Sequence, residues 1–229
     1  MHIGLGLTMQ NLDGQTTDAE VYQQELGLAA QAESAGFDSV WFSEHHFSDY
    51  QLTPQTPMVL SWLAGQTQRI KLGQKATVLP WHDPVRVAES YSVLDHLSGG
   101  RAIAGLGRVE FNNFRLEMGE SRRRFAEYYD ALANNIAKHG MERFNGFLAD
   151  LQVWGAPDEV TEKLLDYVRR CDAGALVIDV TFGDMPYDEA RANFDLFGSE
   201  VLPELHRHDV GGDIGVSYGA RLQEAPSGV

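Results

Sequence analysis

Few cysteines, few basic residues and no long apolar run limit what this chain of 229 residues can be. Its one cysteine, Cys171, cannot form an internal disulfide, which fits a reducing cytoplasm, where we expect the protein. No apolar stretch approaches the about 18 residues of a membrane span. The N-terminal sequence MHIGLGLTMQ also lacks the basic and then apolar order of a secretory signal.

Basic residues are the scarcer charged type. Lysine and arginine number 18 against 33 aspartate and glutamate, so the formal net charge is −15. We therefore expect neither nucleic acid nor an anionic membrane as a partner. A local group of arginines can still bind an anionic small molecule.

Apolar residues are plentiful, at 43% of the chain, which is enough for a sizeable core and excludes a disordered protein. Short apolar segments alternate with stretches whose apolar residues recur at helical spacing. We expect five strands, at 3–7, 37–43, 70–79, 101–106 and 175–181. We expect helices at 18–36, 56–66, 84–97, 121–139, 158–171 and 187–205. Parallel βα units that never reverse predict a barrel or a doubly wound sheet, although a complete (β/α)₈ barrel needs eight strands.

The residues directly after each strand are candidate functional residues, because sites in parallel α/β folds form at the carboxyl ends of strands. The segment Ser43-Glu44-His45-His46-Phe47 follows the second expected strand. A histidine there suits proton transfer, and a hydrogen-bonded pair that closes the strand is the structural alternative. We expect no metal, since no third and fourth ligand stand at suitable spacing. His82-Asp83 is predicted to cap the following helix.

Two arginine segments are candidate anion sites. In Gly105-Leu106-Gly107-Arg108 the glycines permit close approach to the backbone, and Arg108 can pair with a phosphate. The third glycine of the dinucleotide fingerprint is missing, so a surface arginine is equally consistent. Ser121-Arg122-Arg123-Arg124 begins a helix and is either an anion site or a solvated face.

Several of these segments together resemble the bacterial luciferase-like flavin-dependent monooxygenases. The resemblance rests on VWFSEHHF, on LGQKATVLPWHDPVRVAESYSVLDHLSGGRAIAGLGR and on WGAPDEVTEKLLDYVRR, and it covers residues 1–130 and 152–206. It implies a (β/α)₈ TIM barrel that binds FMN, or a deazaflavin in one branch, at the mouth of the barrel. Reduced FMN, supplied by a flavin reductase, and O₂ would oxidise an aldehyde or another small organic substrate.

The resemblance also assigns site residues. His45 matches the proton-transfer histidine of the His-His motif, and a non-proline cis peptide beneath the flavin ring maps onto Gln74-Lys75. Arg108 and Arg122 match the arginines that contact the flavin phosphate. The implied cofactor-binding residues are Gln74, Lys75, Gly107, Arg108 and Arg122. Val109 stands where the family often has glycine.

The middle of the family barrel is missing from this sequence. No fifth, sixth or seventh strand is evident, and we expect a deletion seam near Ala133. We therefore predict an α/β fold of the (β/α)₈ TIM-barrel type in a reduced or incomplete form. It would form a single domain at 1–206, followed by a flexible tail at 207–229. A shortened non-fluorescent flavoprotein of luminous bacteria belongs to the same family, and a segment absent from this chain is the alternative explanation.

Three functions stay open on this basis. The chain is a flavin-dependent monooxygenase, or a flavin-binding protein without turnover, or a structural dimer that has lost the flavin. The first is favoured, because His45, Arg108 and Arg122 are all present. The helices at 57–66 and 84–97 carry apolar residues on more than one face, so we expect a homodimer through them.

Overall fold

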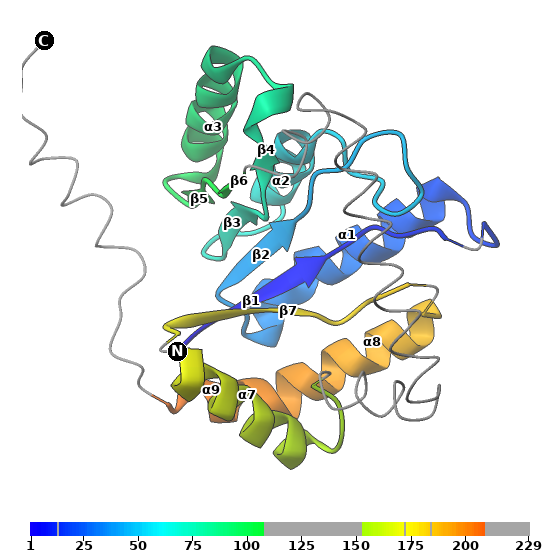
Figure 1. The fold of residues 1–229 in the computed structure, drawn as a ribbon, viewed down its shortest axis with the longest axis vertical. Coiled ribbons are helices and arrows are strands. Elements are labelled where there is room, and N and C mark those ends of the chain that lie inside the picture. The colour runs from blue at the N-terminus through cyan, green and yellow to red at the C-terminus, as the bar shows by residue number, and fades with distance from the viewer. Residues whose placement is uncertain (13, 108–152, 172, 184, 209–229) are drawn as a thin grey trace, which may run out of the picture.

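The computed structural model describes residues 1–12, 14–107, 153–171, 173–183 and 185–208, and all structural statements refer to these residues. Five parallel strands form one sheet in the order β5-β3-β2-β1-β7 (Figure 1). They are β1 (His2–Leu7), β2 (Ser39–Phe42), β3 (Lys71–Gln74), β5 (Ala102–Ile103) and β7 (Ala175–Asp179). A second parallel ladder joins β4 (Thr77–Val78) to β6 (Leu106–Gly107).

The strand order together with the packing of the helices distinguishes between the two predicted architectures. Successive strands are added on one side of β1, and the last described strand, β7, pairs with the other side of β1. A doubly wound sheet can also place a later strand on the free side of its first strand, but its helices cover both faces of the sheet. Here α3 (Pro84–Ser98) packs on α2 (Thr56–Ala64), α2 on α1 (Asp18–Ala35) and α1 on α8 (Tyr187–Leu196), so these helices form one continuous layer, as they do around a barrel. The described sheet therefore has the winding of a barrel.

The helices begin and end where local chemistry favours it. They are α1 (Asp18–Ala35), α2 (Thr56–Ala64), α3 (Pro84–Ser98), α7 (Pro157–Cys171), α8 (Tyr187–Leu196) and α9 (Leu202–His206), with a 3₁₀ turn η1 (Leu79–Trp81) before α3. Thr17 and Glu20 form a capping box at the start of α1, and Gly36, at φ 100°, ends that helix. Asp83 accepts hydrogen bonds from two backbone amides of α3, so its predicted capping role is confirmed.

The core lies between the sheet and its helices. Ile3, Leu5 and Leu7 alternate along β1 and are fully buried in it. Each such side chain contributes roughly 1.5–3 kcal/mol on burial. The intervening glycines of β1 belong to the opposite face, where a Cβ on Gly4 would collide with the Trp41 side chain. That face therefore keeps its space for side chains from the neighbouring strands.

All five expected strands are present, and two expected elements are divided. The third strand is split into β3 and β4, and the fourth into β5 and β6. The expected final helix is α8, a π-helical segment (Phe197–Val201) and α9. Pro203 lies in the first turn of α9 and has no amide to donate to the preceding turn, which accounts for the interruption.

Some expectations fall outside the described residues. These are the helix at 121–139, the seam near Ala133 and most of the tail at 207–229. None of the described helices combines the length and the apolarity that a membrane crossing requires.

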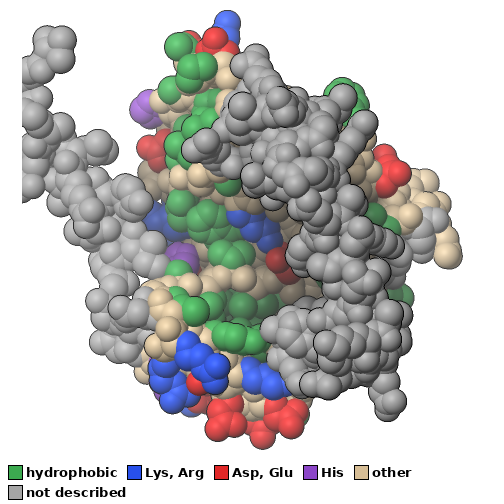
Figure 2. Space-filling model, in the orientation of Figure 1, with side chains coloured by type: hydrophobic (Ala, Val, Ile, Leu, Met, Phe, Trp, Pro, Cys, Tyr) green, Lys and Arg blue, Asp and Glu red, His purple; other side chains and the backbone are tan. Residues whose placement is uncertain are grey.

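Hydrophobic side chains remain on the surface of α2 and α3, and the region of α3 is in view at the upper left of Figure 2. Met58 is 71% exposed and Trp62 45% on α2, while Val85 is 64%, Val93 55% and Leu97 61% exposed on α3. The two helices pack on each other, so these side chains belong to one region of the molecule.

Candidate functional site

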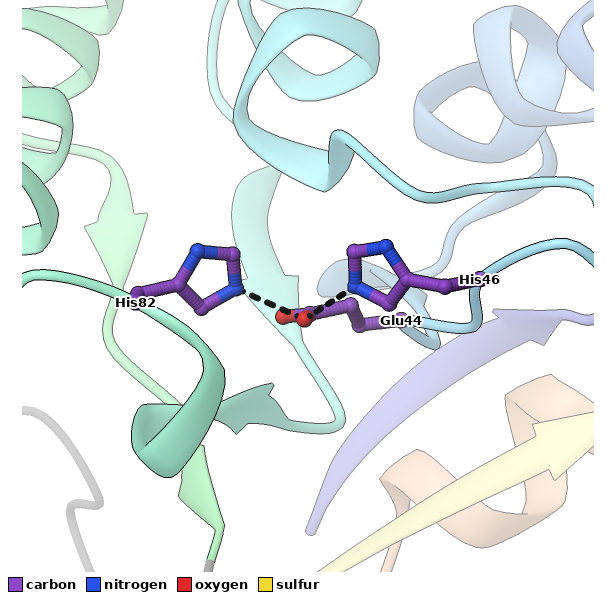
Figure 3. A group of neighbouring side chains, drawn as sticks. All are labelled: Glu44, His46 and His82. Carbon is purple, nitrogen blue, oxygen red and sulfur yellow. Dashed lines mark hydrogen bonds and ion pairs between the residues drawn. The ribbon is translucent and has the colours of Figure 1, made fainter.

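The carboxylate of Glu44 is the centre of a hydrogen-bonded cluster just past the end of β2. Its Oε1 atom accepts hydrogen bonds from Nε2 of His46, at 2.8 Å, and from Nε2 of His82, at 2.7 Å (Figure 3). Its Oε2 atom accepts from the side-chain amide of Gln74 and from the backbone amide of Val78, both at 3.1 Å. The Glu44 side chain is 2% exposed. A carboxylate this deeply buried needs such donors, because it has lost its hydration. We call Glu44, His46, His82 and Gln74 the Glu44 cluster.

Parallel strand pairing brings the members of the Glu44 cluster together. Glu44 and His46 follow β2, Gln74 ends β3, and His82 follows η1. Phe42 lies opposite Gln74 in the register of the two strands, so their carboxyl ends are adjacent. The two imidazoles approach the same oxygen from opposite sides (Figure 3). A slip of one residue in this register would turn Gln74 away from the carboxylate.

Tyr91 of α3 orients the Gln74 side chain of the Glu44 cluster. Its hydroxyl donates to Oε1 of Gln74 at 3.0 Å and lies 2.7 Å from the Thr77 hydroxyl. Burial raises the pKa of Tyr91, and the nearby Glu44 carboxylate raises it further, so the phenol stays protonated and donates. The Gln74 amide is thereby oriented with its NH₂ group toward Glu44.

His45, the predicted proton-transfer residue, is not a member of the Glu44 cluster. Its Nδ1 is buried and makes no hydrogen bond to a described residue. Its ring packs edge-on against Tyr50, with 5.5 Å between the ring centroids, and its backbone amide donates to Thr53. The two adjacent histidines therefore differ: His46 is bound to a carboxylate, and His45 keeps a free ring nitrogen among the described residues.

The predicted position of the cis peptide is wrong by one residue. The non-proline cis bond joins Lys75 to Ala76, not Gln74 to Lys75. The amide of Lys75 donates to the carbonyl of Phe42 at 2.9 Å, so the Gln74-Lys75 peptide continues the regular ladder between β3 and β2. The irregular bond lies just after this last ladder contact.

Gly107, expected to bind the cofactor, lies on β6 opposite Val78. The turn before it passes close to the end of β3: a Cβ on Gly105 would collide with the carbonyl oxygen of Gln74. Glycine at position 105 is therefore what allows β6 to lie beside the Glu44 cluster.

Lys75 reaches across the sheet. Its ammonium forms an ion pair with Asp179 at the end of β7, and the pair lies over Gly6 of β1, where a Cβ would touch both groups. The side chains are 25% and 38% exposed. This ion pair places one positive and one negative charge at the carboxyl edge of the sheet.

A pocket of about 120 Å³ opens beside the Glu44 cluster, between the segment after β2 and α3. Glu44, Gln74 and His82 form part of its wall, and Arg86 and Tyr91 line it from α3. Cofactor pockets typically measure about 300–1,000 Å³, so this one is too small for a flavin ring. It gives a small molecule or water a route to the cluster.

The Glu44 cluster contains three potential metal ligands. One oxygen of Glu44 and one ring nitrogen each of His46 and His82 lie within 4.8 Å of one another. The expectation of no metal assumed that no further ligand was available, and that assumption is wrong. The three atoms are already joined by hydrogen bonds of ordinary length, so a metal ion would have to replace both of these bonds.

The sequence prediction missed Glu44 and His82. Glu44 could have been singled out, because a carboxylate just past a buried strand needs donors. His82 could not, since its contact with Glu44 depends on where η1 turns. The predicted phosphate-binding residues Arg108 and Arg122 lie outside the described residues.

Comparison with known proteins gives a consistent family assignment. The family model for luciferase-like monooxygenases matches residues 1–143. The chain is 33% identical over 135 residues to the alkanal monooxygenase alpha chain of Photorhabdus laumondii, covering 57% of this chain and 38% of the relative. It is 35% identical over 118 residues to limonene 1,2-monooxygenase of Rhodococcus erythropolis, covering 50% of this chain and 30% of the relative. The chain thus spans well under half the length of these relatives.

A solved structure shows the same fold over nearly the whole chain. The crystal structure of the monooxygenase RslO1 from Streptomyces bottropensis matches with a TM-score of 0.68 at 20% identity, covering 89% of this chain and 99% of that chain. At this identity the match establishes the fold alone. The predicted α/β fold of TIM-barrel type, in reduced form, is confirmed.

We predict that Glu44→Gln lowers the free energy of unfolding by about 2 kcal/mol or more. Both Glu44 oxygens now accept hydrogen bonds. A glutamine would turn an NH₂ group toward some of these donors, which would then lose their acceptor. Urea denaturation measures the loss. The control is Glu89→Gln on the exposed side of α3, where the ion pair with Arg86 is solvated and we expect a change below about 0.5 kcal/mol. Equal effects of the two substitutions would contradict a structural role for the Glu44 cluster.

Proposed function

The chain belongs to the luciferase-like monooxygenase family, and on that premise we propose that it is a flavin-dependent monooxygenase. Its substrate would be a small organic molecule such as an aldehyde, oxidised with O₂ and a reduced flavin. Reduced flavin supplies the electrons that activate O₂; the chain's own residues bind it, exclude water and move a proton. FMN from a separate reductase is the proposed form, and a deazaflavin is the alternative.

The observation that carries the proposal is the unpartnered ring nitrogen of His45. Nδ1 is buried and makes no hydrogen bond to a described residue. His45 itself comes just after β2, at the edge of the sheet where β3 and β6 also end. A buried imidazole nitrogen without a partner is costly in a resting protein and useful when a ligand supplies the partner. We assign His45 as the group that takes up or returns a proton at Nδ1.

The Glu44 cluster would position the floor of the site. Glu44 binds the side chain of Gln74 and so fixes the end of β3. The Lys75-Ala76 segment begins directly after this fixed residue. We place the flavin ring against this segment, on the side of the sheet where Lys75 pairs with Asp179. Gly107 would allow close approach, with Arg108 and Arg122 binding the phosphate by charge-assisted hydrogen bonds.

Flavin titration of the purified protein tests the cofactor assignment. We expect FMN to bind, and Arg108→Ala to weaken binding by about tenfold or more, the scale of a lost hydrogen bond to a charged group. The control is Arg170→Ala on the exposed side of α7, where Arg170 pairs with Asp166. Equal affinity of the Arg108 variant and the native protein would remove Arg108 from the site. The same titration with a deazaflavin decides between the two cofactors.

Turnover separates the enzyme from a flavin-binding protein of the same family. With reduced FMN, O₂ and an aldehyde, we expect O₂-dependent product, and we expect His45→Ala to reduce it by roughly 10²–10⁴-fold while flavin stays bound. His46→Ala is the comparison: it should lower stability through the Glu44 cluster and keep a larger share of turnover. Flavin binding without product would favour the non-catalytic reading, and loss of turnover in His46→Ala alone would mean that the wrong histidine is assigned.

We also propose a homodimer through α2 and α3, because their exposed apolar side chains form one region without cover among the described residues. Trp62→Glu should convert a species of twice the chain mass to one of single mass, since a charge would be buried in the contact. Light scattering measures both. Leu196→Glu on α8, 49% exposed, is the matched control and should leave the dimer intact. A native protein of single-chain mass would overturn this proposal.

A further inference from the structure

A second pocket, of about 260 Å³, lies at the carboxyl ends of β1 and β7. Its walls come from the segments that follow these strands and from α1 and α8, which contact each other beside β1 and β7 (Figure 1). At about 30 Å³ per water-sized group, it has room for roughly eight non-hydrogen atoms. Nothing in the proposed flavin reaction uses it.

The pocket is lined by buried polar atoms that lack partners. Thr8 Oγ1, Gln10 Nε2, Asn11 Oδ1 and Glu25 Oε2 make no hydrogen bond to a described residue. Thr8 is 6% exposed, and Gln10 and Glu25 are each 8% exposed. Buried polar atoms in native proteins are bonded to protein, ordered water or a ligand, so these four mark a place where molecules in the pocket supply the partners.

The other end of three of these side chains is already held. The Thr181 hydroxyl donates to Oε1 of Glu25 at 2.9 Å, and the amide of Gly183 donates to Oε1 of Gln10 at 2.6 Å. Nδ2 of Asn11 donates to the Thr16 carbonyl at 2.9 Å. Each side chain is thus fixed by its protein partner, with its free atom left to the pocket, so the site is preorganised.

The free atoms specify the charge of the ligand. Asn11 Oδ1 and the ionised Glu25 Oε2 only accept a hydrogen bond, Gln10 Nε2 only donates, and the Thr8 hydroxyl can do either. No lysine or arginine is among the described lining residues. Burial raises the pKa of Glu25, and Asp179 raises it further, while hydrogen bonds from the Thr181 side chain and from the backbone of Met9 and Thr8 lower it. Because Oε2 points into a pocket without a described basic side chain, a cationic ligand group would supply the opposite charge there.

We propose that this pocket binds a small amino alcohol as its ammonium ion. The ammonium group donates to Glu25 and Asn11, and the hydroxyl oxygen accepts from Gln10. The carbon atoms lie against the apolar part of the wall, formed by Met185 and Tyr187. A molecule of this class places a positive charge against Glu25, which a diol cannot do, and offers an acceptor to Gln10, which a simple alkylammonium ion cannot do.

Calorimetric titration of the flavin-free protein at pH 8 tests the proposal with three probes of matched size: 3-amino-1-propanol, 1,3-propanediol and n-butylamine. We expect 3-amino-1-propanol to bind about tenfold or more tightly than the diol, the scale of a charge-assisted hydrogen bond, and more tightly than n-butylamine. A diol that binds as tightly as the amino alcohol overturns the proposal. So does the absence of saturable binding of 3-amino-1-propanol at millimolar concentrations.

The variant Glu25→Gln locates the site. It keeps the size of the side chain and an oxygen for the Thr181 hydroxyl, and it should weaken 3-amino-1-propanol by about tenfold or more. Glu189→Gln, which removes the same charge from the exposed first turn of α8, should change affinity less than about twofold because surface charges are screened. Equal loss in both variants would contradict this location. The comparison of probes on the native protein needs no variant to fold, and no arm depends on flavin.

Discussion

Burying the Glu44 carboxylate constrains everything around the candidate site. Taken from water, it needs donors on both oxygens, and they come from parts of the chain that only the β2–β3 register brings together. A cluster with every member satisfied is rigid, while one missing donor leaves a buried charge short of partners. The buried carboxylate therefore keeps all its donors only when the strand register, η1 and the start of α3 are formed together.

The two adjacent histidines differ in whether they bind this carboxylate. His46 is hydrogen-bonded to Glu44, which also binds Gln74 at the end of β3. His45 makes no such bond among the described residues, and its Nδ1 is left for another partner. The two histidines thus differ in their hydrogen bonds, and the proposed proton-transfer residue, His45, lies next to a histidine that the Glu44 cluster holds in place.

The sequence predicted what depends on local periodicity and missed what depends on tertiary contact. The five strands and the Asp83 cap follow from apolar spacing and turn chemistry, whereas the choice of a barrel comes from the family resemblance. Arg101 shows the limit: it is buried and donates to Thr67, Ile70 and Ala64, acceptors more than 30 positions earlier in the chain. No local sequence pattern predicts such a contact. The position predicted for the cis bond comes from the family resemblance, and the structure has the bond one residue later, between Lys75 and Ala76.

The ion pair between Lys75 and Asp179 connects the two sites. It extends from the end of β3 over Gly6 to the end of β7, so it links the side of the sheet with the Glu44 cluster to the side with the second pocket. Partly exposed ion pairs contribute little to stability, so its importance lies in position. Asp179 acts electrostatically on Glu25 and pairs with Lys75. A cation beside Glu25 and a charge change near Lys75 therefore act on one carboxylate, and any coupling between the sites must be reciprocal.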